Sequence, residues 1–186
     1  MPGTTPSQTV GPYFSIGLPW EDGEDVVATG TPGTIRVHGR LLDGEGEPVP
    51  DGLIDTWQAD AEGRFTDPDA PGGPSTAEGF RGFGRSGTDA GGAWGINTIK
   101  PGAVAGADGA PQAPHIAVSV FSRGLLVRLV TRIYFADEAE ANAADPALAS
   151  LPDDAARATL VAQPDRDGYR LDIRLQGEGE TVFFDV

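Results

Sequence analysis

The sequence predicts an all-β protein, a β-sandwich of mostly antiparallel strands with long loops. Short runs rich in β-branched and aromatic residues recur along the chain, and its 27 glycines and 16 prolines are spread between these runs. A length of 186 residues fits one domain, 1–186, that is large enough to bury a core. An N-terminal arm over residues 1–30 and one or two short helices complete the expected architecture.

Short runs of strand-forming residues mark the expected strands, with clear alternation of apolar and polar residues at 35–41 and 169–176 and many β-branched residues at 125–135. These strands lie at 35–41, 53–57, 94–99, 115–122, 125–135 and 169–176. Long loops over 60–92 and 101–113 separate some of them, and loops of such length are often functional.

The arm also alternates, with Phe14, Ile16, Leu18 and Trp20 at every second position, which indicates an extended conformation. Few local partners are available to bury these side chains. We therefore expect the arm to lie across a partner's surface or across the sandwich itself.

Helices are expected only near the C-terminus. Residues 137–150 are rich in Ala and Glu, with Asp137 as a plausible N-cap and Pro146 as a residue that starts or interrupts a helix. Residues 153–163 are a second helix candidate.

Charge and composition exclude several classes of protein. A net charge of −15 repels phosphate backbones, so nucleic acid is not an expected partner. No apolar run approaches the ~20 residues of a membrane helix, and the first residues do not resemble a signal peptide. The absence of cysteine rules out disulfides and thiolate metal sites and fits a cytoplasmic protein. An anionic small molecule would need a local cation to approach this acidic chain.

One expected strand carries half of a metal-binding pattern. In an extended strand, side chains two positions apart point the same way. A histidine pair at 115 and 117 could therefore hold one metal ion, but the chain has His115 and Ala117.

Seven motifs, in order along the whole chain, resemble those of the intradiol ring-cleavage dioxygenase family. Each motif alone is weak, but their order and coverage make the resemblance specific. The motifs are TPSQTVGPY at 5–13, DTWQAD at 55–60, GFGR at 82–85, TIKPG at 98–102, APHI at 113–116, TRIYF at 131–135 and QGEGETVFFD at 176–185.

Catalytic members of that family hold Fe(III) with two tyrosinates and two histidines, and phenolate oxygen is a hard donor that suits a ferric ion. The resemblance places the first tyrosine in the loop 67–84, near Pro71–Gly73, and the second at about Val104. No tyrosine occurs between Tyr13 and Tyr134. Both phenolate ligands are therefore missing.

The same resemblance matches His115 to the first histidine ligand, Ala117 to the second, and Gln112 to an arginine that steadies the substrate. His115, Ala117, Val104 and Gln112 are therefore interpreted as a vestigial site, with no metal ligands and no catalytic residues expected in this chain. One imidazole cannot retain ferric iron against water and chelators.

The resemblance implies a heteromer. A β chain of the same fold would bind Fe(III), and this chain, inactive alone, would line the β chain's substrate pocket. The implied reaction cleaves protocatechuate with O2 to 3-carboxy-cis,cis-muconate, in the β-ketoadipate route of aromatic catabolism. A higher αβ oligomer is also implied.

Five residues are candidates for that shared pocket. Thr9, Gly11, Pro12 and Tyr13 match the family segment that lines it, and Arg123 offers a planar fork for a benzoate carboxylate. If the strand from 115 continues regularly, Arg123 lies near the vestigial site or at an interface beside it. The alternatives are a surface turn with Tyr13 in the chain's own core, and a solvated Arg123.

Two other functions remain open from the residues. One is an independent enzyme with an unusual metal site, built from His115 with Asp or Glu ligands. The other is a non-catalytic β-sandwich binding module unrelated to ring cleavage.

Overall fold

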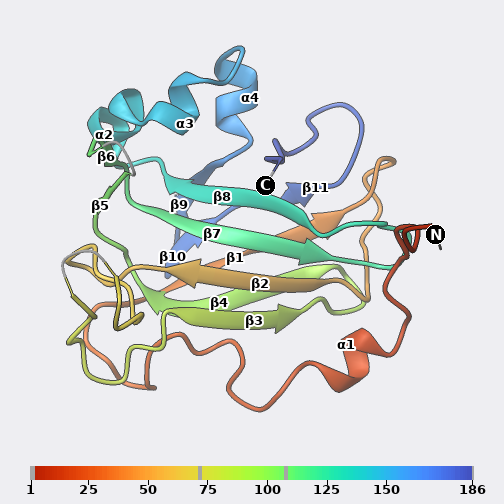
Figure 1. Ribbon diagram of the computed structural model, residues 1–186, viewed down its shortest axis with the longest axis horizontal. Coiled ribbons are helices and arrows are strands. Elements are labelled where there is room, and N and C mark those ends of the chain that lie inside the picture. Colours follow the sequence, from red (N-terminus) through yellow and green to blue (C-terminus); the bar gives the residue numbers. More distant parts are fainter. Residues whose placement is uncertain (1–2, 71–72, 107–108, 186) are drawn as a thin grey trace.

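Two packed layers of β-strands dominate this computed structural model, which describes residues 3–70, 73–106 and 109–185 (Figure 1). Its strands are β1 (Thr34–Leu42), β2 (Leu53–Gln58), β3 (Phe83–Gly87), β4 (Ala93–Ile99), β5 (Val104–Ala105), β6 (Pro111–Gln112), β7 (His115–Phe121), β8 (Leu129–Phe135), β9 (Val161–Asp165), β10 (Gly168–Arg170) and β11 (Ile173–Arg174). Its helices are α1 (Phe14–Gly17), α2 (Ala139–Ala144), α3 (Pro146–Ala149) and α4 (Asp154–Ala158). No helix of the described residues is both long and apolar enough to cross a bilayer.

One hydrogen-bonded path links the two layers. It runs β11-β1-β10-β9-β8-β7-β2-β3, with β4 paired to β1 outside the path. Most neighbouring strands are antiparallel, whereas β1 pairs in parallel with β10 and β11, and β8 pairs in parallel with β9. The strands β3 and β4, at the two ends of this arrangement, adjoin in sequence, so the sheet nearly closes. The predicted all-β fold is confirmed.

The core lies between the layers because every second side chain of the strands points inward. Along β7, Ile116, Val118 and Val120 are buried while the alternate residues are half-buried on the outer face. The inward residues join apolar side chains of β1, β2, β4 and β8 in one cluster. The vestigial residues His115 and Ala117 therefore lie on the outer face of the sheet, away from the main core.

The strands expected at 35–41, 53–57, 94–99 and 115–122 are present with small shifts at their ends. The strand expected at 125–135 begins only at Leu129, because residues 125–128 form a largely exposed loop after the turn at Arg123 and Gly124.

The loop expected at 60–92 contains strand β3, which the sequence pattern did not predict. Strand β3 has Gly84 at an inward position, where a larger residue would be expected. A Cβ atom there would lie 2.7 Å from Val26 Cγ2 and 2.8 Å from Thr56 Oγ1. Glycine is thus required by close packing, and its lack of a side chain removes the alternation that predicts a strand.

The strand expected at 169–176 is divided into β10 and β11. Between them the chain passes very close to β1, since a Cβ at Gly39 would overlap the Leu171 carbonyl. Here the Arg40 N–H donates to Asp172 Oδ1 at 3.0 Å, so a side chain replaces a backbone acceptor. The alternation of side chains survives this interruption, which is why the pattern predicted one strand.

The N-terminal arm differs from the expected extended form at one point. Phe14–Gly17 form a short helix, α1, instead of continuing the alternation. Further on, Val26 and Val27 are buried in the main core, whereas Tyr13 and Ile16 are highly exposed. The arm thus packs on its own sandwich in its second half and leaves its first half open.

The C-terminal helices are shorter than expected and are capped differently. Asp145, not Asp137, is the effective cap: its side chain accepts hydrogen bonds from Ala147 and Leu148 at the start of α3. Asp137 instead accepts hydrogen bonds from Lys100 and Tyr169. The helix expected at 153–163 ends at Ala158, and strand β9 follows it.

Candidate functional site

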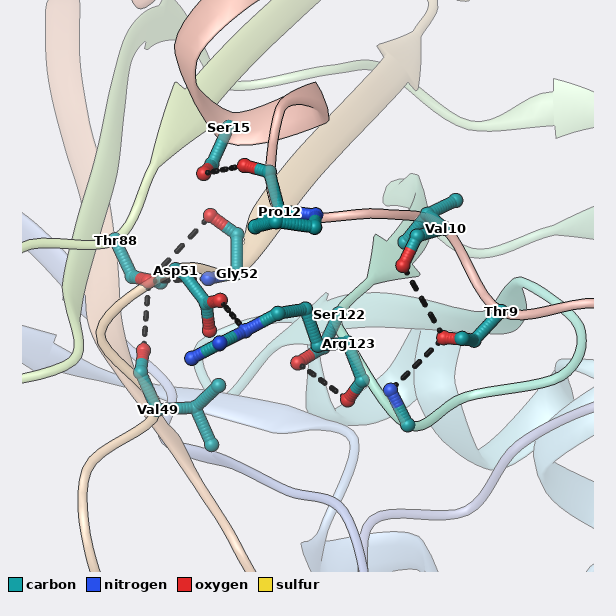
Figure 2. A network of polar contacts seen from close by, with 11 residues as sticks. Thr9, Val10, Pro12, Ser15, Val49, Asp51, Gly52, Thr88, Ser122 and Arg123 are labelled. Atoms are coloured by element: carbon teal, nitrogen blue, oxygen red, sulfur yellow. Dashed lines mark hydrogen bonds and ion pairs between the residues drawn. The ribbon is translucent and has the colours of Figure 1, made fainter.

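The N-terminal arm is hydrogen bonded to the turn that follows β7. The backbone N–H of Gly124 donates to Thr9 Oγ1 at 2.9 Å (Figure 2). A bond from the Leu125 N–H to the Ser122 carbonyl at 3.3 Å closes the turn, and the φ of Gly124 is +89°, which suits glycine. Two separate parts of the predicted pocket, Thr9 and Arg123, are therefore brought together.

Arg123 lies in this turn, beyond the end of β7, and its Nε atom forms an ion pair with Asp51 Oδ2 (Figure 2). The Arg123 side chain is 58% exposed and that of Asp51 is 20% exposed. The strand does not continue regularly to Arg123, because β7 ends at Phe121, so Arg123 does not share the outer face of β7 with His115. Roughly 25 Å of extended chain separates Arg123 from His115, so it lies at the far end of β7 from the vestigial site.

Tyr13 projects from the arm with 80% of its surface exposed, so it does not occupy this chain's own core. The turn before it is held by bonds from the Phe14 N–H to the Gly11 carbonyl at 3.3 Å and from Ser15 Oγ to the Pro12 carbonyl at 3.0 Å. Among the described residues, only Gly11 itself and its two chain neighbours have atoms within 4 Å of a Cβ built on Gly11. The Gly11–Pro12–Tyr13 segment thus presents backbone and an aromatic ring to the outside.

A shallow apolar hollow adjoins this site. Gln8 and Val10 of the arm line it together with residues 121–122 and 125–128, around a volume of about 230 Å³. Leu126 and Val127 on its rim are 60% and 63% exposed. Large apolar residues left open in this way are typical of surfaces that bind another protein.

The register of four strands gathers the vestigial residues. Val104 of β5 pairs with Gln112 of β6, and Ala117 of β7 lies opposite Arg132 of β8. Arg132 Nη1 donates to Gln112 Oε1 at 2.8 Å, which links the two strand pairs. His115 lies two positions from Ala117 on the same face of β7. The structure thus places these four residues near Arg132, a residue that the sequence reasoning missed.

A neutral histidine and a protonated tyrosine stand beside this arginine. His115 Nδ1 lies 2.8 Å from the Ala113 carbonyl, and burial lowers the pKa of His115, with Arg132 acting in the same direction. Burial raises the pKa of Tyr134 to about 12. The Tyr134 hydroxyl donates to Asp145 Oδ1 at 3.2 Å and accepts from Arg132 Nη1 at 3.3 Å.

This set of groups does not fit ferric iron. It offers one imidazole, a phenol that stays protonated, and a guanidinium whose positive charge opposes a cation. Within residues 3–70, 73–106 and 109–185, no group of three or more His, Cys, Asp or Glu could hold a metal ion. Pro71 and Gly72, near the expected place of the first tyrosine, lie outside the described residues.

The sequence reasoning missed three charged residues at these sites. Asp145 had a usable signal, because Asp followed by Pro at the first helical position is a common helix start. Arg132 could have been placed by alternation along β8, on the same face as Tyr134. Asp51 gave no local signal, since its contact with Arg123 depends on tertiary structure.

Comparison with known proteins gives the family. A family model described as dioxygenase matches residues 9–177. The protocatechuate 3,4-dioxygenase alpha chain of Pseudomonas putida is 44% identical over 198 residues, which covers 97% of this chain and 96% of the relative. The chain belongs to the intradiol dioxygenase family. The alpha chain of Burkholderia cepacia is 45% identical over 199 residues, covering 98% and 97% of the two chains.

An intradiol dioxygenase β chain is also similar to this chain. The protocatechuate 3,4-dioxygenase beta chain of Burkholderia cepacia is 38% identical over 161 residues, which covers 79% of this chain and 66% of the beta chain. The two kinds of chain are therefore related to one another as well as to this protein. The predicted family is confirmed.

Solved structures agree with the fold. The dioxygenase domain of a carbohydrate-binding fusion protein from Streptomyces sp. SirexAA-E has a TM-score of 0.59 at 24% identity, covering 93% of this chain and 99% of that domain. Catechol 1,2-dioxygenase from Pseudomonas arvilla C-1 has a TM-score of 0.62 at 22% identity, covering 82% and 55%. At such identities these likenesses establish the intradiol dioxygenase fold alone.

Proposed function

We propose that this chain is the α subunit of a two-chain protocatechuate 3,4-dioxygenase. The enzyme cleaves protocatechuate with O2 to 3-carboxy-cis,cis-muconate, and a β chain of the same fold holds the Fe(III) that supplies the reactive centre. One observation carries the proposal: similarity to α chains over nearly the full length is combined with a vestigial site whose donors do not suit ferric iron.

In this proposal, Thr9, Gly11, Pro12, Tyr13 and Arg123 line the β chain's substrate pocket. Two observations support this assignment. The hydrogen bond between Thr9 and Gly124 holds the arm beside Arg123, and the side chains of Tyr13 and Arg123 are exposed. The Arg123 guanidinium binds and orients the substrate carboxylate and counters the acidic field of a chain with a net charge of −15. The arm excludes water from the face of the ring.

The exposed apolar residues of the arm support a protein partner on this side. Tyr13, Ile16, Leu18 and Trp20 are 80%, 75%, 46% and 45% exposed. Burial of such groups would stabilise a complex by about 25 cal/mol for each Å² removed from water, less the cost of association. We propose that the β chain covers them, that αβ pairs assemble into a larger oligomer, and that the enzyme acts in the cytoplasm.

Co-expression with an iron-bearing β chain tests this function. The two chains should co-purify as a coloured complex with oxygen uptake on protocatechuate, whereas this chain alone should show neither colour nor uptake. Failure to form any complex would favour a binding module without a role in ring cleavage. Oxygen uptake by this chain alone would favour an independent enzyme.

A further inference from the structure

We infer that Asp51 is a positioning residue for Arg123 and that it directs the guanidinium toward the substrate carboxylate. The inference rests on the proposed function, in which Arg123 binds that carboxylate. It adds a residue that does not touch the substrate but determines which edge of the guanidinium the substrate meets.

The geometry of the ion pair carries this inference. Asp51 Oδ2 contacts Nε of Arg123, on the inner edge of the guanidinium. Across the described parts of the chain, neither terminal Nη atom of Arg123 donates a hydrogen bond to another residue. One N–H bond of Nη1 and one of Nη2 are parallel and form the outer edge of the guanidinium. This edge can therefore donate two parallel hydrogen bonds to one carboxylate. Asp51 thus occupies one edge and leaves the bidentate edge open.

The two partners differ in exposure: the Asp51 side chain is mostly buried, whereas the Arg123 side chain extends into solvent. The exposed fraction is 20% for the Asp51 side chain and 58% for that of Arg123. A free arginine side chain loses about 2 kcal/mol of rotamer entropy when it is fixed by a ligand. An arginine that is already tethered has lost part of that freedom before the substrate arrives.

Asp51 is held in place by backbone hydrogen bonds on both sides of it. The Gly52 N–H donates to Thr88 Oγ1 at 2.7 Å, and the Thr88 hydroxyl donates to the Val49 carbonyl at 2.6 Å (Figure 2). A Cβ on Gly52 would lie 2.3 Å from Leu41 Cδ2, so any larger residue here would displace the buried Leu41 side chain. The turn that carries Asp51 is therefore fastened on both sides of the carboxylate.

Steady-state kinetics of the αβ complex test the inference with Asp51→Asn. The matched control is Asp154→Asn, which makes the same charge change at a side chain that is 99% exposed on α4. We expect KM for protocatechuate to rise on the order of tenfold in Asp51→Asn, with kcat within about twofold. Binding of 4-methylcatechol, which has no carboxylate, should be unchanged, as should both parameters in the control.

The double variant Asp51→Asn/Arg123→Ala separates positioning from a general loss of structure. If Asp51 acts through Arg123, its substitution should change KM little further once Arg123 is gone. A further rise of the same size in the double variant would overturn the inference. So would an unchanged or lowered KM in Asp51→Asn while Arg123→Ala raises KM, and in that case the proposed function would stand. If Arg123→Ala has no effect, the proposed role of Arg123 fails as well.

Discussion

Thr9 accepts a hydrogen bond from the Gly124 backbone at 2.9 Å and thereby fastens the N-terminal arm beside Arg123. Both residues belong to loops that face outward, and neither helps to form the core. The contact joins two segments that the sequence keeps far apart, at the end of the molecule where the arm and the turn after β7 meet (Figure 1).

Thr9→Val should loosen the arm, because the Gly124 N–H then loses its acceptor at a cost of about 1 kcal/mol. Limited proteolysis of the isolated chain should cut within residues 3–17 several times faster in the variant than in the parent. Thr5→Val is the control, since Thr5 lies earlier in the same exposed arm. Equal cutting rates for parent and Thr9→Val would mean that this bond does not hold the arm.

Arg123→Ala should weaken protocatechuate binding in the αβ complex by about 1–3 kcal/mol, which corresponds to roughly a 5- to 150-fold rise in KM. The physical reason is the loss of a charge-assisted contact with the substrate carboxylate. Arg166→Ala, in the exposed loop between β9 and β10, removes the same charge elsewhere and should leave KM unchanged. If KM and kcat of Arg123→Ala equal those of the parent, Arg123 has no part in the pocket.

Asp145→Ala should destabilise the chain by about 2–4 kcal/mol. Its buried carboxylate accepts hydrogen bonds from the backbone of Ala113, Ala147 and Leu148 and from the Tyr134 hydroxyl, all of which would lose their partner. Urea unfolding measures the change. Asp153→Ala, which removes the cap of α4 at an exposed position, should cost only about 1 kcal/mol. Equal losses in the two variants would contradict this ranking.

His115 should make stability fall as the pH drops below about 6.5. Burial lowers the pKa of His115 in the folded chain below its ordinary 6.5, so the unfolded chain binds the proton first. This contribution is fully present above pH 6.5 and is lost toward the lowered pKa, at up to about 1.4 kcal/mol per pH unit. Urea unfolding between pH 7.5 and 5.5 should show a shallower decline for His115→Gln than for the parent.

Ala117→His should not create an iron site. The second imidazole would lie on the same face as His115, but Arg132 stands opposite position 117 and no phenolate is available. Iron analysis after exposure to Fe(III) and washing with a chelator should give the same low content for parent and variant. Retention of stoichiometric iron by Ala117→His would refute this account of the site.

The sequence could predict those features that depend on local pattern. The alternation around Val37, Ile96 and Val118 follows from a half-buried strand and marks β1, β4 and β7 correctly. It fails at Gly84, where tight packing requires a glycine, and at Asp172, where a side chain interrupts the ladder without disturbing the alternation. Helix α1 was missed because its apolar residues fit an extended arm equally well.

The candidate site was predictable where residue identity alone decides the chemistry. Comparison with the family's ligand pattern was enough to show that no tyrosine stands near Val104 and that position 117 is alanine. The contacts of Arg123 with Asp51 and of Arg132 with Gln112 join strands and turns distant in sequence, so they needed the tertiary structure.

Metal analysis of the purified isolated chain, beside the same analysis of its complex with a β chain, tests the central claim most directly. The account predicts no bound iron and no ring cleavage by the chain alone, and stoichiometric iron with oxygen uptake once the β chain is present. Tightly bound iron and cleavage of protocatechuate by the isolated chain would contradict it.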